Sequence, residues 1–185
     1  MKIEINMQKP VKKLNNFWNH IHYHPTDAIE DDWGKAIIDR IAEDDVAKTI
    51  RIYTMFEDIV SKNESGELVY DFSLNDYRMD YLIKKGFNLF VGYNFIPPVI
   101  AKNPEQVSES ERYKGKTICN SQPADYTLWQ KICHDYTQHI VDRYGIDRVS
   151  SWRMQCYNEP DLTRYWKPDG DECTEEKQQT EYNKL

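Results

Sequence analysis

Apolar residues recur at helical spacing in several stretches of the chain, and polar residues separate them. The clearest stretch carries an apolar residue at every fourth position from Leu128 to Tyr144 and then meets Gly145, which is typical of an amphipathic helix that packs on a core. Asn75 or Ser73 is the expected cap of an earlier helix. The patterns predict helices over residues 31–45, 75–85 and 125–145, and the opening of a fourth helix within 173–185.

Shorter runs rich in β-branched and aromatic residues lie between these helices and predict strands. The predicted strands are residues 17–23, 48–56, 87–95 and 149–159. The last run closes with Asn158, Glu159 and Pro160. Because proline cannot donate to a sheet and restricts the residue before it to an extended conformation, we expect the fourth strand to end at Glu159, with the carboxylate at its mouth.

Four strand–helix units in succession predict an α/β fold with parallel strands and right-handed crossovers. Two architectures fit this order, an open doubly wound sheet and part of a (β/α)8 TIM barrel. No glycine-rich GxGxxG loop follows any strand, which counts against a nucleotide-binding sheet. A complete barrel needs about 250 residues. We therefore expect residues 1–185 to be the first four β/α units, the N-terminal half of a barrel domain that stops in its fourth helix.

Composition narrows the class of protein. The net charge is −7 and the longest basic runs are two residues, so the concentrated positive patch that nucleic-acid binding requires is absent. The 4 cysteines are scattered without a CxxC pair, which indicates neither a zinc site nor a disulfide scaffold. The sequence shows no signal peptide and no apolar stretch long enough to span a bilayer, so we expect a cytoplasmic protein without a membrane partner.

Polar and aromatic side chains gather at the predicted C-terminal ends of the strands, where (β/α)8 enzymes carry their reactive groups. Carboxylate, amide, hydroxyl and aromatic groups together suit a sugar, which offers hydroxyls to bond and a C–H face to stack. Aromatic surroundings would favour the protonated form of Glu159, as a general acid requires. The strand-end residues are His20, His22, His24, Arg51, Tyr53, Glu57, Asp58, Tyr93, Asn94, Phe95, Asn158, Glu159, Tyr165 and Trp166.

The histidines of "HIHYH" (residues 20–24) have a rival interpretation. Alternate residues of a strand point the same way, so three imidazoles could hold a zinc ion with an open position. No carboxylate or cysteine with ligand spacing accompanies them, and we expect no metal. We expect one or two of these imidazoles, His22 among them, to line the pocket as hydrogen-bond partners instead.

Several motifs in order resemble the family 39 glycoside hydrolases, the β-xylosidases and relatives such as α-L-iduronidase. The resemblance extends from Phe17 to Leu185 and rests on "FWN", "DDW", "YDFSLNDYRMDYLIKKGF", "FIPPVIA", "VDRYGIDRV", "YNEPDL" and "RYW". It implies a retaining mechanism on a (β/α)8 barrel without a cofactor. By this likeness Glu159 is the acid/base, and Asn158 hydrogen-bonds the 2-hydroxyl of the sugar.

The resemblance also implies other substrate-binding residues. Phe95 and Trp166 would be aromatics that face the sugar, and Arg51 would support the catalytic carboxylates. Tyr53 stands where the family usually has the histidine of an Arg-x-His motif. With the residues that strand-end chemistry selects, the predicted substrate-binding set is Asn158, Tyr53, Arg51, Phe95, Asn94, Trp166 and His22.

A retaining enzyme needs a second carboxylate about 5–5.5 Å from the first as nucleophile. In the resembled family it lies on strand seven, and nothing in this sequence places Glu57 or Asp58 opposite Glu159. We therefore expect a β-xylosidase-like fragment for xylo-oligosaccharides or another glycoside, inactive by itself. The alternatives are a non-catalytic half-barrel that binds sugar or assembles as a homo-oligomer through its strand edges, and a histidine metalloprotein.

Overall fold

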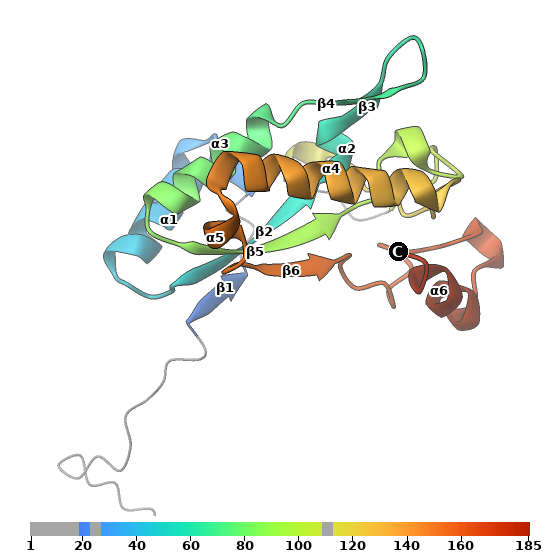
Figure 1. The fold of residues 1–185 in the computed structure, drawn as a ribbon. Helices are drawn as coiled ribbons and strands as arrows, with labels where there is room; N and C mark the ends of the chain where they lie inside the picture. Colours follow the sequence, from blue (N-terminus) through green and yellow to red (C-terminus); the bar gives the residue numbers. More distant parts are fainter. Residues whose placement is uncertain (1–18, 23–26, 109–112) are drawn as a thin grey trace, which may run out of the picture.

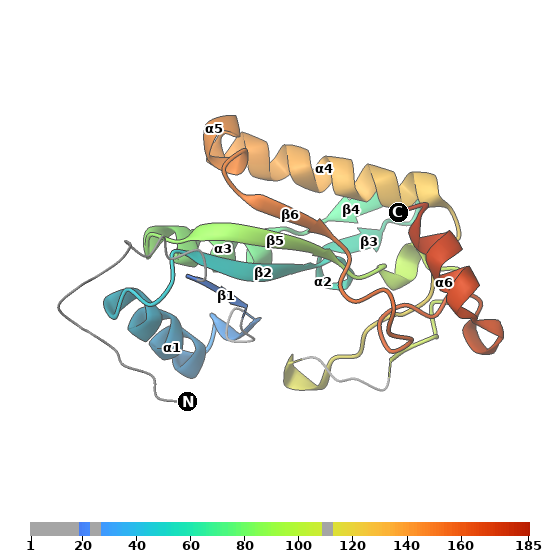
Figure 2. The ribbon, with the colours of Figure 1, turned by 90° about the horizontal axis from the view of Figure 1, so that it is seen from below.

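A computed structural model describes residues 19–22, 27–108 and 113–185 of the chain. Its main feature is a four-stranded parallel sheet in the order β1-β2-β5-β6. The strands are β1 (His20–His22), β2 (Thr49–Met55), β5 (Asn88–Asn94) and β6 (Arg153–Cys156). Figures 1 and 2 show them side by side. The order advances in one direction without the reversal that defines a doubly wound sheet, which favours the barrel architecture.

Helices cover one face of this sheet. They are α1 (Asp32–Glu43), α3 (Ser73–Lys84) and α4 (Tyr126–Tyr144), and Figure 1 shows α3 and α4 lying along the same side of the strands. Alternate strand residues such as Ile52 and Val91 point into a single apolar core with these helices. The core residues that the helices contribute are Ile38, Met79, Leu82, Trp129, Ile132, Tyr136 and Ile140.

Short elements connect these units. A single turn of helix, α2 (Phe56–Ile59), leads into a small antiparallel hairpin of β3 (Val60–Lys62) and β4 (Leu68–Tyr70). The connection before α4 contains the 3-10 turns η2 (Pro98–Ile100) and η3 (Tyr113–Gly115). After β6 follow η4 (Gly170–Glu172) and α6 (Glu175–Tyr182), which lie beyond the C-terminal ends of the strands in Figures 1 and 2.

Most predicted elements are confirmed within one or two residues at each end, and the last helix falls within 173–185 as expected. The first strand is described over His20–His22, and residues 17, 18 and 23 of the predicted strand lie outside the described residues. The predicted cap of α3 is wrong. The Asp71 carboxylate accepts from the Ser73 N–H over 3.0 Å, while Asn75 lies inside the helix and is buried.

The fourth strand is much shorter than the predicted 149–159. Val149, the first residue of the predicted strand, is instead a buried core residue at the end of a helical turn, α5 (Ile146–Val149). The Val149 N–H donates to Gly145 O over 3.1 Å. An apolar residue at a helical turn gives the same sequence signal as one in a strand, so hydrophobicity alone placed the start of β6 too early. Its end is also earlier than expected, at Cys156.

Candidate active site

The face of the sheet opposite the helices carries a hydrogen-bonded polar network. The Tyr53 hydroxyl donates to Asn158 Oδ1 over 2.8 Å, and Arg51 Nη2 donates to the same oxygen over 3.0 Å. Arg51 also donates to Gln155 Oε1, and its guanidinium lies 4.7 Å from the centre of the Tyr53 ring. Two donors from β2 therefore hold the amide oxygen of Asn158, which leaves its Nδ2 as the group that can donate to a ligand.

Gly92 makes this approach across the sheet possible. It lies on β5 between Tyr53 of β2 and Gln155 of β6 in the strand register. A Cβ at Gly92 would lie 2.9 Å from Tyr53 Cδ1 and 2.8 Å from Asn94 Nδ2, too close for either contact. Sequence analysis did not select Gly92 or Gln155. Successive residues of a strand point to opposite faces of the sheet, and this alternation places Gly92 and Gln155 on the same face as Tyr53.

The Tyr53 hydroxyl remains a neutral donor over the physiological pH range. Burial disfavours the phenolate and raises the pKa of Tyr53 to about 12, although the nearby Arg51 charge acts in the opposite direction. A neutral hydroxyl carries one hydrogen to give, and Asn158 Oδ1 takes it. Tyr53 and Arg51, which we predicted to bind substrate, thus share Asn158 Oδ1 as a hydrogen-bond acceptor.

Glu159 follows β6 in an irregular segment, contrary to the expectation of an extended strand end. Tyr157 and Glu159 have φ angles of 58° and 45°, in the left-handed region that L-residues rarely adopt. The Leu162 N–H donates to Glu159 O over 3.0 Å, so Pro160 and Asp161 are the central residues of a turn. Proline suits the first central position of such a turn, and this explains the Glu-Pro sequence better than a strand stop does.

The Glu159 side chain is half exposed (50%), and its Oε2 lies 4.0 Å from Arg164 Nη2. The aromatic side chains that we expected around this carboxylate are buried in the core instead. Phe95, Tyr157 and Trp166 are buried, and Tyr157 contacts each of the other two rings edge to face. They support the segment that carries Glu159.

Trp166 and Phe95 present no exposed ring face, so a sugar cannot stack on either in this arrangement. Trp166 is 0% exposed; its indole N–H donates to Gln178 O over 3.1 Å, which anchors α6. Phe95 is 1% exposed and stacks on Tyr165 with ring centres 5.5 Å apart. The positions of both rings support a packing role, in place of the sugar contact that we predicted.

Asn94, another predicted sugar contact, ends β5 and is fully buried. Neither atom of its amide group has a hydrogen-bond partner among the described residues. Buried amides are normally hydrogen-bonded, so Asn94 keeps donors and an acceptor for a ligand. A sugar would reach them only after neighbouring side chains move.

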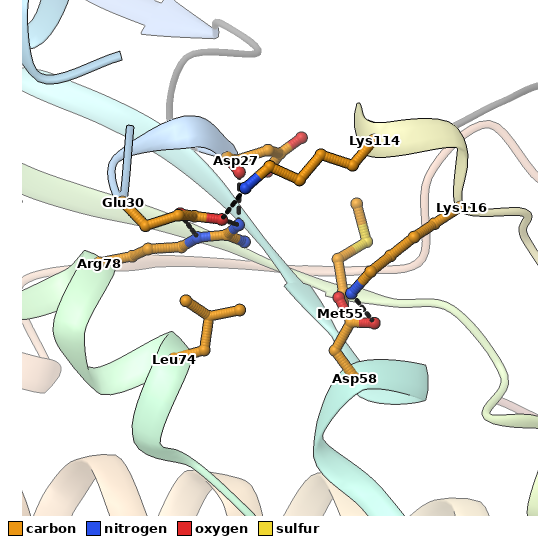
Figure 3. A pocket seen from close by; sticks show the side chains of 8 residues that line it. All are labelled: Asp27, Glu30, Met55, Asp58, Leu74, Arg78, Lys114 and Lys116. Atoms are coloured by element: carbon orange, nitrogen blue, oxygen red, sulfur yellow. Dashed lines mark hydrogen bonds and ion pairs between the residues drawn. The ribbon is translucent and has the colours of Figure 1, made fainter. Parts of the chain in front are cut away.

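The other candidate carboxylates have different partners. Glu57 Oε2 accepts from the Phe95 N–H over 3.1 Å, and Asp58 pairs with Lys116 Nζ over 2.9 Å. Asp58 and Lys116 belong to a hollow of about 340 Å³ at the rim of the sheet, shown in Figure 3. In that hollow Arg78 donates to both carboxylate oxygens of Glu30, over 3.0 and 2.8 Å. Arg78 and Lys116 are thus paired with carboxylates of the same hollow, and Glu159 is not among its lining residues.

The described residues include only part of the histidine motif. His22 pairs with Arg51 in the strand register, while its side chain and His24 lie outside the described residues. In the described part of the chain no three His, Cys, Asp or Glu side chains are grouped to hold a metal ion. Nor does that part contain a helix long and apolar enough to cross a membrane.

Comparisons with known proteins relate this geometry to a family. The family model of glycosyl hydrolases family 39 matches residues 1–180. A β-xylosidase of Caldicellulosiruptor saccharolyticus is 29% identical over 172 residues, which are 90% of this chain and 34% of that protein. A β-xylosidase of Geobacillus stearothermophilus is 29% identical over 98 residues, 53% of this chain and 18% of that protein. The chain thus spans about a third or less of the length of these relatives.

Solved structures agree in fold. A family 39 enzyme from Xanthomonas axonopodis pv. citri superposes with a TM-score of 0.65 at 24% identity, over 80% of this chain and 28% of that one. A monomeric β-xylosidase from Caulobacter crescentus gives the same TM-score at 22% identity and the same coverage. With the sequential parallel strand order, this likeness confirms the predicted α/β fold as part of a (β/α)8 barrel. From the match over residues 1–180, the chain belongs to glycosyl hydrolases family 39.

Proposed function

We propose that this chain supplies the acid/base part of the active site of a retaining glycoside hydrolase that acts on β-xylosides. The observation that carries the proposal is the pair Asn158–Glu159 directly after β6, with Asn158 held by two donors from β2 and Glu159 half exposed beside it. Such a pair at the C-terminal end of a barrel strand lies where this fold places catalytic groups.

Glu159 acts first as an acid and then as a base. It gives its proton to the glycosidic oxygen while the bond between that oxygen and the anomeric carbon breaks and the nucleophile attacks. In the second step the Glu159 carboxylate takes a proton from water, whose oxygen bonds to the anomeric carbon and displaces the nucleophile. The half-exposed position supports this exchange, because both leaving group and water must reach the same carboxyl oxygen.

Asn158 holds the sugar at its 2-hydroxyl. Its Oδ1 is already the acceptor for Tyr53 and Arg51, so Nδ2 is the donor directed to the substrate. A hydrogen bond at the 2-position strengthens as the oxocarbenium-like transition state forms, and so contributes to rate rather than to binding alone. Tyr53 and Arg51 contribute through Asn158.

The preference for β-xylosides rests on the two β-xylosidases at 29% identity. We assign the nucleophile to no residue of this chain. Glu57 is bound to a backbone N–H and Asp58 to Lys116, so neither is proposed for the role.

The test compares Glu159→Gln with the unaltered sequence on xylobiose and on a nitrophenyl β-xyloside, both in a complete enzyme that joins this chain to the part that carries the nucleophile. Xylobiose has a leaving group that needs a proton, and nitrophenolate leaves without one. We expect kcat/KM for xylobiose to fall by about 10²–10⁴-fold, the usual contribution of general acid catalysis, and the bond-breaking step of the nitrophenyl substrate to fall far less. Glu64→Gln, at an exposed turn, is the matched control and should change neither.

Equal losses on both substrates would contradict the acid role of Glu159. Absence of any hydrolysis by the complete enzyme would contradict the enzymatic proposal itself. The non-catalytic alternative, a half-barrel that binds sugar or assembles with a partner, would then be favoured.

A further inference from the structure

The long connection before α4 folds back onto the segment that follows Glu159, and the two enclose a cavity of about 270 Å³. Figure 2 shows these segments side by side at the C-terminal ends of the strands. The Lys167 N–H donates to Asn120 O over 2.7 Å and joins them directly. The cavity is lined by Gln106, Val107, Asn120, Thr163, Arg164 and Lys167.

Hydrogen bonds fix the walls of this cavity. Asn120 is buried; its Nδ2 donates to Thr163 O over 2.9 Å and its Oδ1 accepts from Gln106 Nε2 over 2.9 Å. Gln106 Nε2 also donates to Lys167 O over 2.8 Å. Because the side-chain amides tie both segments together, the shape of the cavity does not depend on a ligand being present.

The charge of the cavity is one-sided. Among the described residues that line it, Arg164 and Lys167 are the ionisable ones and none is a carboxylate, although the chain as a whole carries a net charge of −7. The rim hollow of Figure 3 instead has as many acidic as basic side chains. A neighbouring hollow beside α6 is lined by Asp161 and Glu175 without any basic residue. The cation-lined cavity is therefore suited to an anion in a way that these two are not.

Each cation is paired with a carboxylate that a ligand can replace. Arg164 Nη2 lies 4.0 Å from Glu159 Oε2, and Lys167 Nζ lies 2.8 Å from Asp171 Oδ1. The Arg164 side chain is 55% exposed and the Asp171 side chain 100% exposed. Ion pairs between exposed groups contribute little in water, so a carboxylate that also bonds the cavity walls can compete for these cations.

We propose that this cavity binds a sugar unit that bears a carboxylate, a uronic acid, on the leaving-group side of the bond that Glu159 protonates. Arg164 is common to the cavity and to the surroundings of Glu159, which makes the two sites adjoin. A cavity of about 270 Å³ lies just below the usual range of about 300–1,000 Å³ for small-molecule sites and so suits a single sugar ring. The carboxylate pairs with Arg164 and Lys167, and Val107 offers an apolar surface. The leaving-group placement rests on the proposed function.

The experiment is a titration of this chain with glucuronate and, separately, with xylose and acetate, followed by NMR. We expect glucuronate to shift the side-chain amide signals of Asn120 and Gln106, and to bind at least about tenfold more tightly than xylose or acetate, since loss of one charge-assisted hydrogen bond corresponds to a tenfold change or more. Arg164→Gln and Lys167→Gln should each weaken glucuronate binding by about tenfold. Lys62→Gln, which removes an equal charge from the exposed hairpin, should not.

Equal binding of glucuronate and xylose would overturn the proposal, as would equal binding of acetate, which has the charge without the ring. An effect of Lys62→Gln as large as that of Arg164→Gln would also overturn it, because overall charge would then explain the affinity. Unchanged signals of core residues in the variants establish that they are folded. Glu159→Gln should keep the glucuronate site, so a failed acid role appears in the hydrolysis assay and a failed cavity appears only in the titration.

Discussion

The hydroxyl of Tyr53 and the amide oxygen of Asn158 are 105 residues apart in sequence and 2.8 Å apart in the structure. This hydrogen bond joins β2 to the segment that carries Glu159, across β5. It also decides which end of the Asn158 amide is presented to a ligand, because an oxygen that accepts from two donors stays turned toward them. The bond makes Tyr53 a positioning residue.

Tyr53→Phe tests this role. The variant removes one donor to Asn158 and keeps the ring beneath Arg51. In the complete enzyme we therefore expect kcat/KM for a β-xyloside to fall about 5–10-fold, the equivalent of about 1–1.5 kcal/mol for one hydrogen bond. The fall should largely disappear with a 2-deoxy substrate, which lacks the hydroxyl that Asn158 binds. Tyr77→Phe, on an exposed tyrosine of α3, is the matched control. An equal loss on both substrates would contradict the positioning role.

Gly92→Ala tests the space that this bond requires. The added methyl group would lie 2.9 Å from the Tyr53 ring and 2.8 Å from Asn94 Nδ2, so one of these side chains must move. We expect the free energy of unfolding to fall by about 1–3 kcal/mol, as is usual when a packed site is overfilled. Urea unfolding measures this, with Val69→Ala on the exposed hairpin as a control for substitution in a strand. An unchanged midpoint would mean that the row Tyr53–Gly92–Gln155 is looser than described.

Hydrophobic periodicity was enough to predict the elements in which the apolar residues of the sequence are also the buried ones. β2 and β5 alternate residues between the helix-covered face and the polar face, and α4 buries Ile132, Tyr136 and Ile140 at a spacing of four. The hairpin of β3 and β4 was missed because strands of 3 residues are too short to show a period.

The site could be predicted only in part, for a different physical reason. Their position at the end of a predicted strand identified Asn158 and Glu159 as candidate catalytic-site residues. The left-handed φ of Glu159, however, depends on the turn around Pro160 and not on the apolar run before it. The burial of Trp166 depends on α6, whose Gln178 O accepts its indole N–H. Contacts between distant segments of this kind carry no local pattern that a single sequence reveals.

Tyr136→Phe tests the polar contact within the core. The Tyr136 hydroxyl accepts from Thr54 Oγ1 over 2.9 Å and donates to Asn75 Oδ1 over 3.0 Å, and all three residues are buried. Removing the hydroxyl leaves a buried donor and a buried acceptor unsatisfied, so we expect a loss of about 1–3 kcal/mol in the free energy of unfolding. Thermal and urea unfolding measure it, and Tyr77→Phe should change neither midpoint. An unchanged free energy of unfolding in Tyr136→Phe would show that Thr54 and Asn75 find other hydrogen-bond partners.

The ionisation of Glu30 makes the stability of the fold depend on pH in the acid range. Burial acts to raise its pKa, but the two hydrogen bonds from Arg78, a backbone hydrogen bond and the charges of Arg78 and Lys114 together hold the pKa below the usual value of 4.5. A carboxyl whose pKa is lower in the folded than in the unfolded state stabilises the fold above the unfolded-state pKa, and this stabilisation is lost as pH falls below 4.5.

Glu30→Gln should therefore lower the free energy of unfolding at pH 7 by about 1–3 kcal/mol, because it weakens the charge-assisted hydrogen bonds that Arg78 makes. At an acid pH below the lowered pKa of Glu30 the deficit should shrink, since wild-type Glu30 has then lost its charge as well. Urea unfolding at both pH values measures the two differences, with Glu64→Gln as the exposed control. A deficit of the same size at both pH values would assign the loss to shape rather than to charge.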